Sequence, residues 1–327
     1  MQNPFKYSFD NKRYHTFNYY LKNTYHAKVA KVILDADFTC PNRDGTKGYG
    51  GCIYCSGRGS GDTSAVFHNN LLEQFLANKK AIDAKWQPKL YIPYFQSFSN
   101  TYGPLEKIKN YLEIFKDRDE VAEISLGTRA DCLEPDVVTY LDDFTKYKPI
   151  WLEIGLQTSN DATAKLINRG HDFACFKDAL ERLSKTNIKV CVHVINGLPG
   201  ETREDMLQTI RDFNELPYDA IKFHMLHIIQ NTTLAKMYLQ KPFKVLSETE
   251  YIDILIKQIE MLPPEVIVER VTGDPLKSDL IEPRWILNKK QILNDIDKTF
   301  VKYDTYQGRL YHNKSPYWNG LLLFIHS

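Results

Sequence analysis

The sequence lacks the features that mark membrane-spanning, exported or disordered proteins. No apolar run reaches the roughly 18 residues that a transmembrane helix needs. The amino terminus carries charges where a signal peptide has its apolar region. Neither sign of charge dominates, with 42 basic against 41 acidic residues, and no internal repeat or low-complexity tract is present. These absences predict a folded cytoplasmic protein that makes no membrane contact.

Three of the six cysteines share a single loop, and that loop has no fourth cysteine. Cys40, Cys52 and Cys55 lie in the glycine-rich stretch TCPNRDGTKGYGGCIYC. A structural zinc site needs four ligands, and the nearest downstream histidine is His68, thirteen residues after Cys55. A redox Cys-x-x-Cys pair would leave Cys40 without a role. An iron-sulfur cluster on three cysteines leaves one iron open for a ligand, which explains the missing fourth cysteine.

Short β-branched or apolar runs alternate with longer helical patterns along most of the chain. Such alternation predicts βαβ units and a parallel sheet, either curved into a barrel or open. The predicted strands span residues 30–37, 89–96, 121–128, 150–157, 188–195 and 220–228. The predicted helices lie near residues 69–84, 104–116, 135–145, 173–186, 202–214 and 248–260. We therefore expect an α/β fold with an N-terminal extension (1–29), a barrel (30–262) and a C-terminal extension (263–327).

Polar residues follow the carboxyl ends of these predicted strands. They are Gln96, Arg129 with Asp131, Gln157, and the stretch NGLPGET at 196–202. In α/β barrels this end of the strands carries the active site. The cysteine loop follows the first predicted strand, so it belongs to the same face.

Together these motifs resemble the radical S-adenosylmethionine (SAM) enzymes, whose three cysteines follow the first strand of a partial barrel. The family's familiar spacing is Cys-x3-Cys-x2-Cys, whereas eleven residues separate Cys40 from Cys52 here. A lengthened first gap is similar to that of the elongator catalytic subunit and its bacterial YtqA/YhcC relatives, the MnmL-like group. The resemblance continues through YFQSFSNTY, SLGTRADCL, LEIGLQT, HVINGLPGET and DPLKSDLIEPRWILNKKQILNDID. It implies a partial (β/α)6 radical SAM barrel with a C-terminal extension.

The resemblance also implies cofactors and the residues that bind them. Cys40, Cys52 and Cys55 would be the catalytic, metal-binding cysteines of a 4Fe-4S cluster whose open iron binds SAM. The residues implied to contact SAM are Gln96, Arg129, Gln157, Ile195 and Gly197.

Three of these SAM contacts also have ordinary structural interpretations. Arg129 can pair with the SAM carboxylate or with substrate, or it can form an ion pair with Asp131 or Glu153. Gln157 can meet the ribose or amino acid part of SAM, or it can make loop hydrogen bonds. Gly197 permits close approach of adenine, and a tight strand-to-helix turn requires the same residue.

Three histidines lie on predicted strands. Alternation points His193 into the interior together with Cys191 and Ile195, where we expect it to have a hydrogen-bond partner. His224 and His227 are three residues apart. On one strand they would face opposite sides, so only one of them would enter the barrel.

The resemblance implies reductive cleavage of SAM to methionine and a 5'-deoxyadenosyl radical, which abstracts hydrogen from an unreactive carbon. For MnmL-like members it implies tRNA as the substrate. The carboxymethyl part of 5-carboxymethylaminomethyl-(2-thio)uridine at the wobble position would be removed, leaving 5-aminomethyl-(2-thio)uridine. A flavodoxin or ferredoxin would donate the electron, and a separate methyltransferase would finish the nucleoside.

Basic and aromatic residues are interleaved in two stretches, 13–28 and 282–290. Such residues can neutralise phosphates and stack on bases, but a solvated face with aromatic core contacts explains either stretch as well. The candidate RNA contacts are Arg270, Arg284, Lys289 and Lys290. Two other functions stay open: a radical SAM enzyme acting on a small metabolite, and a non-catalytic iron-sulfur or zinc-binding module.

Overall fold

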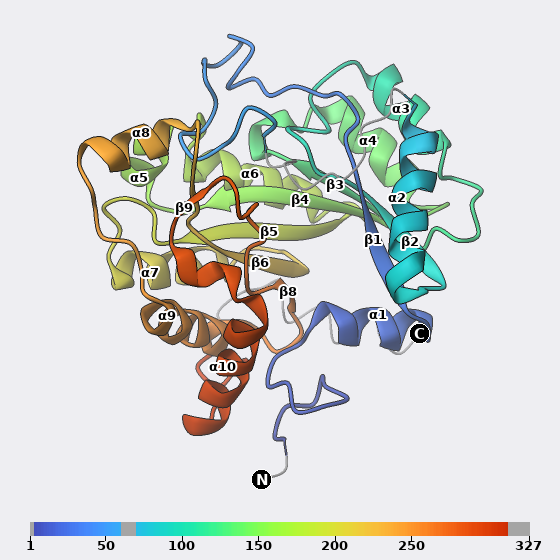
Figure 1. Cartoon of the computed structure of the whole chain (residues 1–327). Coiled ribbons are helices and arrows are strands. Elements are labelled where there is room, and N and C mark those ends of the chain that lie inside the picture. Colours follow the sequence, from blue (N-terminus) through green and yellow to red (C-terminus); the bar gives the residue numbers. More distant parts are fainter. Residues whose placement is uncertain (1–2, 60–69, 313–327) are drawn as a thin grey trace.

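A computed structural model describes residues 3–59 and 70–312 of the chain. Seven parallel strands form one curled sheet in the order β1-β2-β3-β4-β5-β6-β8 (Figure 1). The strands are β1 (Val29–Leu34), β2 (Leu90–Phe95), β3 (Ile124–Thr128), β4 (Ile150–Gln157), β5 (Lys189–Asn196), β6 (Ala220–Met225) and β8 (Ile267–Arg270). A short antiparallel pair joins β7 (Ile228–Ile229) to β9 (Leu280–Glu282). Because β1 and β8 do not pair with each other, the sheet is a half barrel with an open side between them.

Helices connect the strands and pack around the sheet (Figure 1). They are α2 (Leu71–Trp86), α3 (Leu105–Glu113), α4 (Pro135–Phe144), α5 (Asp161–Leu166), α6 (Phe173–Leu183), α7 (Arg203–Phe213), α8 (Thr233–Gln240), α9 (Glu248–Met261) and α10 (Lys289–Lys302), with the short 3-10 helices η1 (Ala130–Cys132) and η2 (Arg284–Leu287). Side-chain caps fix several starts. Thr202 and Ser247 form capping boxes at α7 and α9, and each box satisfies two backbone donors of the first turn.

The first helix, α1 (Phe17–Tyr25), closes the amino-terminal end of the half barrel. The rings of Phe17 and Tyr20 pack edge-on against Trp151, which lies at the start of β4. The Tyr20 hydroxyl donates a hydrogen bond to Glu123, just before β3. One end of the barrel is therefore sealed, which leaves the carboxyl ends of the strands as the accessible end.

The sheet confirms the expected α/β half barrel, and all six predicted strands are present. Every residue of β3 is buried, the polar Ser125 and Thr128 included, as expected for a strand covered on both faces. The seventh strand, β8, falls within the stretch that the sequence assigned to the C-terminal extension, and it pairs with β6. Only four residues long, β8 is too short to give a recognisable period. No helix within the described ranges is long and apolar enough to cross a membrane.

Candidate active site

The cysteine loop after β1 has a defined backbone conformation. The amide of Arg43 donates to the carbonyl of Cys40 at 2.8 Å, and the amide of Cys55 donates to that of Cys52 at 3.0 Å, so each hydrogen bond closes a tight turn. Gly51 has a φ of 75°, and a Cβ atom there would lie 2.7 Å from Nε of Arg43. Only glycine meets both demands, which explains one of the glycines of the loop.

The same loop is fastened to the segment that follows α5. The amide of Ile53 donates to the carbonyl of Ile167 at 3.0 Å. Asn42 donates through Nδ2 to the carbonyl of Asn168, and Asn168 returns a hydrogen bond to the carbonyl of Gly51 at 2.8 Å. These reciprocal amide bonds hold the cysteine loop over the end of β4.

All three cysteines line one cavity of about 160 Å³ at the carboxyl ends of the strands. The cavity lining also includes three of the predicted SAM contacts: Gln96, Arg129 and Gln157. No three His, Cys, Asp or Glu side chains in residues 3–59 and 70–312 converge as ligands of a single metal ion. The cysteines of a four-iron cluster bind different irons and surround the cluster. His68, the weighed zinc ligand, lies outside the described residues.

Arg129 forms an ion pair with Asp131, which is the structural role that the sequence allowed for it. Its Nε and Nη2 atoms donate to the two carboxylate oxygens at 2.8 and 2.9 Å. Burial works to raise the pKa of Asp131, but Arg129 and Lys47 outweigh it and lower that pKa to about 2. Arg129 still lines the cysteine cavity, so its charge acts on the thiols from a fixed position.

The thiol of Cys52 is shifted toward its charged form. A hydrogen bond from Cys55 and the guanidinium of Arg129 lower the pKa of Cys52 to about 6, although burial opposes the shift. The thiolate is the form that binds iron. The same hydrogen bond raises the pKa of Cys55 well above its usual value, so of these two thiols Cys52 is the one that carries the charge.

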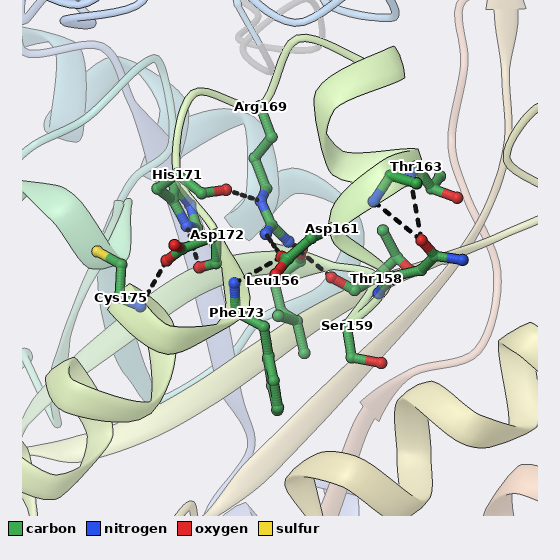
Figure 2. A network of polar contacts seen from close by, with 12 residues as sticks. Leu156, Thr158, Ser159, Asp161, Thr163, Arg169, His171, Asp172, Phe173 and Cys175 are labelled. Atoms are coloured by element: carbon green, nitrogen blue, oxygen red, sulfur yellow. Dashed lines mark hydrogen bonds and ion pairs between the residues drawn. The ribbon is translucent and has the colours of Figure 1, made fainter.

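Sequence reasoning missed Arg169, which is 1% exposed and lines the same cavity. Figure 2 shows its guanidinium within a polar network at the end of β4. Nη1 donates to the carbonyls of Leu156 and Thr158, and Nε donates to that of His171 at 2.9 Å. Nη2 has a long ion pair of 3.7 Å with Asp161 and no hydrogen bond within the described structure. A buried, half-used guanidinium suits a carboxylate ligand. The only sequence signal was its place twelve residues after Gln157.

A buried charge network forms the floor of the half barrel below the cavity. Glu153 accepts from Lys31 at 2.6 Å, from His193 at 2.9 Å and from Lys222. Glu269 pairs with both of these lysines. Burial acts against ionisation, yet Lys222 and Lys31 hold the pKa of Glu153 well below its usual range. The floor thus consists of mutually compensated charges, and His193 has the partner that we expected.

The remaining predicted SAM contacts occupy different places. Gln157 has a positive φ of 61° and lines both the cysteine cavity and its larger neighbour. Ile195 lines only the larger cavity. Gly197 lines neither; its φ is 89°, and a Cβ atom there would lie 3.2 Å from Leu246. The turn geometry and this packing account for Gly197 within the protein alone.

The expectation that only one of His224 and His227 can enter the barrel is wrong. Both line the larger cavity. Strand β6 ends at Met225, so the alternation of an extended strand no longer applies at position 227. The predicted strand ran three residues too far.

The candidate RNA contacts divide between the cavity and the surface. Arg270 ends β8 and lines the larger cavity, whereas Arg284, Lys289 and Lys290 are exposed around η2 and the start of α10. Arg284 donates to the carbonyl of Leu280 at 2.7 Å. The N-terminal stretch 13–28 packs beneath the barrel, where Arg13 is 4% exposed and pairs with Asp304 at 3.0 Å.

Comparison with known families matches residues 42–213 to the Radical SAM superfamily and residues 218–302 to the Radical SAM C-terminal domain. The chain belongs to the radical SAM superfamily. It is 43% identical to the uncharacterized protein YtqA of Bacillus subtilis, over 94% of this chain and 96% of that protein. It is 34% identical to the protein YhcC of Escherichia coli K12, over 85% of this chain and 89% of that protein.

More distant similarity reaches the elongator proteins. Elongator complex protein 3 of Saccharomyces cerevisiae is 27% identical over 46% of this chain and 27% of that protein. The solved structure of Elp3 from the archaeon Methanocaldococcus infernus matches with a TM-score of 0.64 at 17% identity, covering 86% of this chain and 64% of that one. At this identity the match shows a shared fold.

The superfamily implies a 4Fe-4S cluster and SAM, and the residues of the cavity fit both. Cys40, Cys52 and Cys55 supply three thiolates from a loop fixed at both ends. Arg129 and Arg169 place positive charge beside a cluster that the thiolates make negative. Nη2 of Arg169, a residue that lines the same cavity, has no hydrogen-bond partner within the described residues.

Proposed function

We propose that this radical SAM enzyme removes the carboxymethyl part of 5-carboxymethylaminomethyl-(2-thio)uridine at the wobble position of tRNA, leaving 5-aminomethyl-(2-thio)uridine. The observation that carries the proposal is the continuity of two cavities. The cysteine cavity shares Tyr54, Cys55, Gly59, Gln96, Gln157 and His193 with a second cavity of about 810 Å³. That volume lies within the usual range for ligand sites, about 300–1,000 Å³, and suits a nucleoside.

The position of the larger cavity supports a macromolecular substrate. Its lining includes Ile33 on β1 and Arg270 on β8, the two edge strands of the sheet. The cavity therefore lies along the open side of the half barrel. A base turned out of an anticodon loop can enter there while the rest of the tRNA stays outside. The similarity to elongator complex protein 3 supports the same substrate class.

The residues of the site have separate roles in this proposal. SAM and a reduced cluster, when held here, would supply the radical that takes a hydrogen atom from the carboxymethyl CH2. Loss of one further electron to the electron carrier and of a proton would give an imine, and its hydrolysis by water would release the two carbons as glyoxylate and leave the amine. Cys40, Cys52 and Cys55 hold the cluster, and Arg169 orients SAM through its carboxylate. Gln157, which lines both cavities, lies where it can contact SAM and substrate. The closed floor beneath Glu153 keeps bulk water from the reacting atoms.

Partners follow from the same proposal. The electron would come from a small carrier such as flavodoxin or ferredoxin. A separate methyltransferase would act on the aminomethyl product. The exposed Arg284, Lys289 and Lys290 would contact the tRNA backbone.

The test uses anaerobically reconstituted protein, dithionite, SAM and tRNA from a strain that lacks the gene. Mass spectrometry of the nucleosides should show 5-aminomethyl-(2-thio)uridine appearing as the carboxymethylated form disappears, together with 5'-deoxyadenosine. Cys52→Ala should abolish both products, whereas Cys175→Ala, at a cysteine that lines neither cavity, should not.

Two outcomes would contradict the proposal. Deoxyadenosine formation without any change in tRNA would favour a small-metabolite substrate. No SAM cleavage by protein with a full complement of iron would favour a non-catalytic iron-sulfur module.

A further inference from the structure

One part of the larger cavity, lined by residues that the cysteine cavity does not share, has polar groups that the fold does not use. This wall is formed by the end of β8, the segment after β6 and the loop that follows β8. The side chains of interest are Arg270, His224 and His227. None of them is explained by the cluster or by SAM.

Arg270 has most of its hydrogen-bonding capacity unused. Its side chain is 36% exposed, and its one ion pair in the described residues is a long contact of 3.5 Å from Nη2 to Asp274. That carboxylate is already bound by Nζ of Lys289 at 2.6 and 2.8 Å. Asp274 is therefore a poor competitor for the guanidinium, which can form a planar, two-pronged contact with an incoming anion.

His224 and His227 add neutral rings to the same wall, and protein atoms cover their Nε2 nitrogens. The Nε2 atom of each ring is shielded from solvent and has no hydrogen-bond partner within the described part of the chain. Burial lowers the pKa of His227 to about 4 and that of His224 well below its usual value, and the charge of Arg270 acts in the same direction. Gly273 leaves room for the His227 ring, since a Cβ atom there would lie 2.1 Å from Nε2.

Other charged groups near this wall are already paired. Lys222 is held by Glu153 and Glu269 in the floor. Asp279, which also lines the cavity, accepts a hydrogen bond from Ser278 at 2.6 Å. Lys85 also lines the cavity, but it comes from α2. Among the described residues that β6, β8 and the segments after them contribute to this wall, Arg270 is the cation with donors to spare.

We propose that Arg270, in a wall completed by the neutral rings of His224 and His227, binds the carboxylate of the substrate's carboxymethylaminomethyl side chain. This inference rests on the proposed function. It places the carboxylate beside Arg270, which the cysteine cavity does not share, so that the rest of the side chain can extend toward the residues common to both cavities. The product has lost the carboxylate and keeps a positively charged amine, which Arg270 repels. The same residue therefore selects substrate and favours release of product.

The test compares binding of two anticodon stem-loops, one with 5-carboxymethylaminomethyluridine and one with 5-aminomethyluridine at the wobble position. Fluorescence anisotropy with the reconstituted holoenzyme and SAM gives a dissociation constant for each. Wild-type protein should bind the carboxymethylated stem-loop about tenfold or more tightly, as expected for a charge-assisted pair. Arg270→Gln should bring the ratio close to one by weakening the carboxymethylated stem-loop and slightly tightening the aminomethyl one, because the repulsion of its amine is lost.

Further variants separate recognition from folding. Arg270→Lys keeps the charge but loses the planar fork, so it should retain part of the preference. His224→Asn should lower the preference less than Arg270→Gln. Arg118→Gln, at an arginine that pairs with Glu120 before β3, should leave both constants unchanged. Thermal melting of each variant shows whether the fold is intact.

The outcomes distinguish this inference from the proposed function. If Arg270→Gln weakens both stem-loops equally, the residue binds tRNA phosphate and the carboxylate inference is overturned. If the wild-type enzyme forms the aminomethyl product but Arg270→Gln keeps the full preference, the inference fails while the proposed function stands. If wild-type protein shows neither preference nor product, both are overturned.

Discussion

Polar side chains are paired differently in the floor of the half barrel and in the cysteine cavity at the carboxyl ends of the strands, here called the rim. In the floor, Lys31 and Lys222 interlock with Glu153 and Glu269, and each charge has an opposite charge beside it. At the rim, Arg169 keeps a donor without a hydrogen bond in the described structure. Charges that are satisfied without a ligand specify the fold. Donors left over in a buried cavity mark the places where ligands complete the structure.

The largest expected effect separates rim chemistry from folding. Cys52→Ala should lower SAM cleavage by roughly 100-fold or more, because the cluster supplies the chemistry. The denaturation midpoint of the iron-free protein should change little, since Cys52 belongs to a loop outside the main core. Iron analysis and deoxyadenosine assays check the first part, and urea titration checks the second. A fully active Cys52→Ala protein would contradict the assignment of the cluster.

A substitution in the floor should instead lower the stability of the fold. Glu153→Gln removes the shared partner of two buried lysines, so we expect a loss of about 3–5 kcal/mol in the free energy of unfolding. Urea denaturation measures this loss. Glu181→Gln, at an exposed position on α6, is the matched control and should have no measurable effect. Equal stability of the two variants would show that the floor charges are not a structural unit.

A substitution at Arg169 tests both sides of the comparison, since this residue bonds to loop carbonyls and is proposed to bind SAM. Arg169→Lys keeps the charge but loses the fork that reaches the carbonyls and the unused donor. The KM for SAM should rise about tenfold, the value of one charge-assisted hydrogen bond. Arg182→Lys on α6, which keeps an exposed ion pair with Asp178, should leave the KM unchanged. An unchanged KM in Arg169→Lys would remove this residue from the SAM site.

A pH-dependent effect concerns Glu201, next to the turn after β5. Burial raises the pKa of Glu201 from 4.5 to about 7, while Thr158 donates to it at 2.5 Å. The folded state therefore holds this proton more tightly than the unfolded state, and stability falls as pH rises from about 4.5 to 7. Glu201→Gln should flatten this slope and gain about 2 kcal/mol at pH 7.5 relative to wild type. Urea titrations at pH 5 and 7.5 test the difference; parallel curves would contradict it.

Much of the fold was predictable because it depends on local patterns. Six strands and the cysteine loop followed from alternation and spacing, since a buried strand requires a run of apolar residues. The short strand β8 was not predictable, because its four residues gain their place only by pairing with β6. The helix α5 is similarly brief at six residues.

The site was only partly predictable, for a related reason. The role of the three loop cysteines was predictable from their chemistry and spacing. Arg169 did not, because its importance depends on burial and on which of its donors the fold consumes. That both His224 and His227 line the larger cavity depends on the point where β6 ends, and strand boundaries are the least certain feature of a sequence pattern.

The most direct test of the central claim is electron paramagnetic resonance of the reconstituted, dithionite-reduced protein with and without SAM. Three cysteines with an open iron predict the signal of a reduced 4Fe-4S cluster, and SAM should shift that signal by binding to the open iron. Cys175→Ala should behave like wild type, and Cys52→Ala should lack the signal. A cluster signal that SAM leaves unchanged, or protein that binds zinc in place of iron, would contradict the claim.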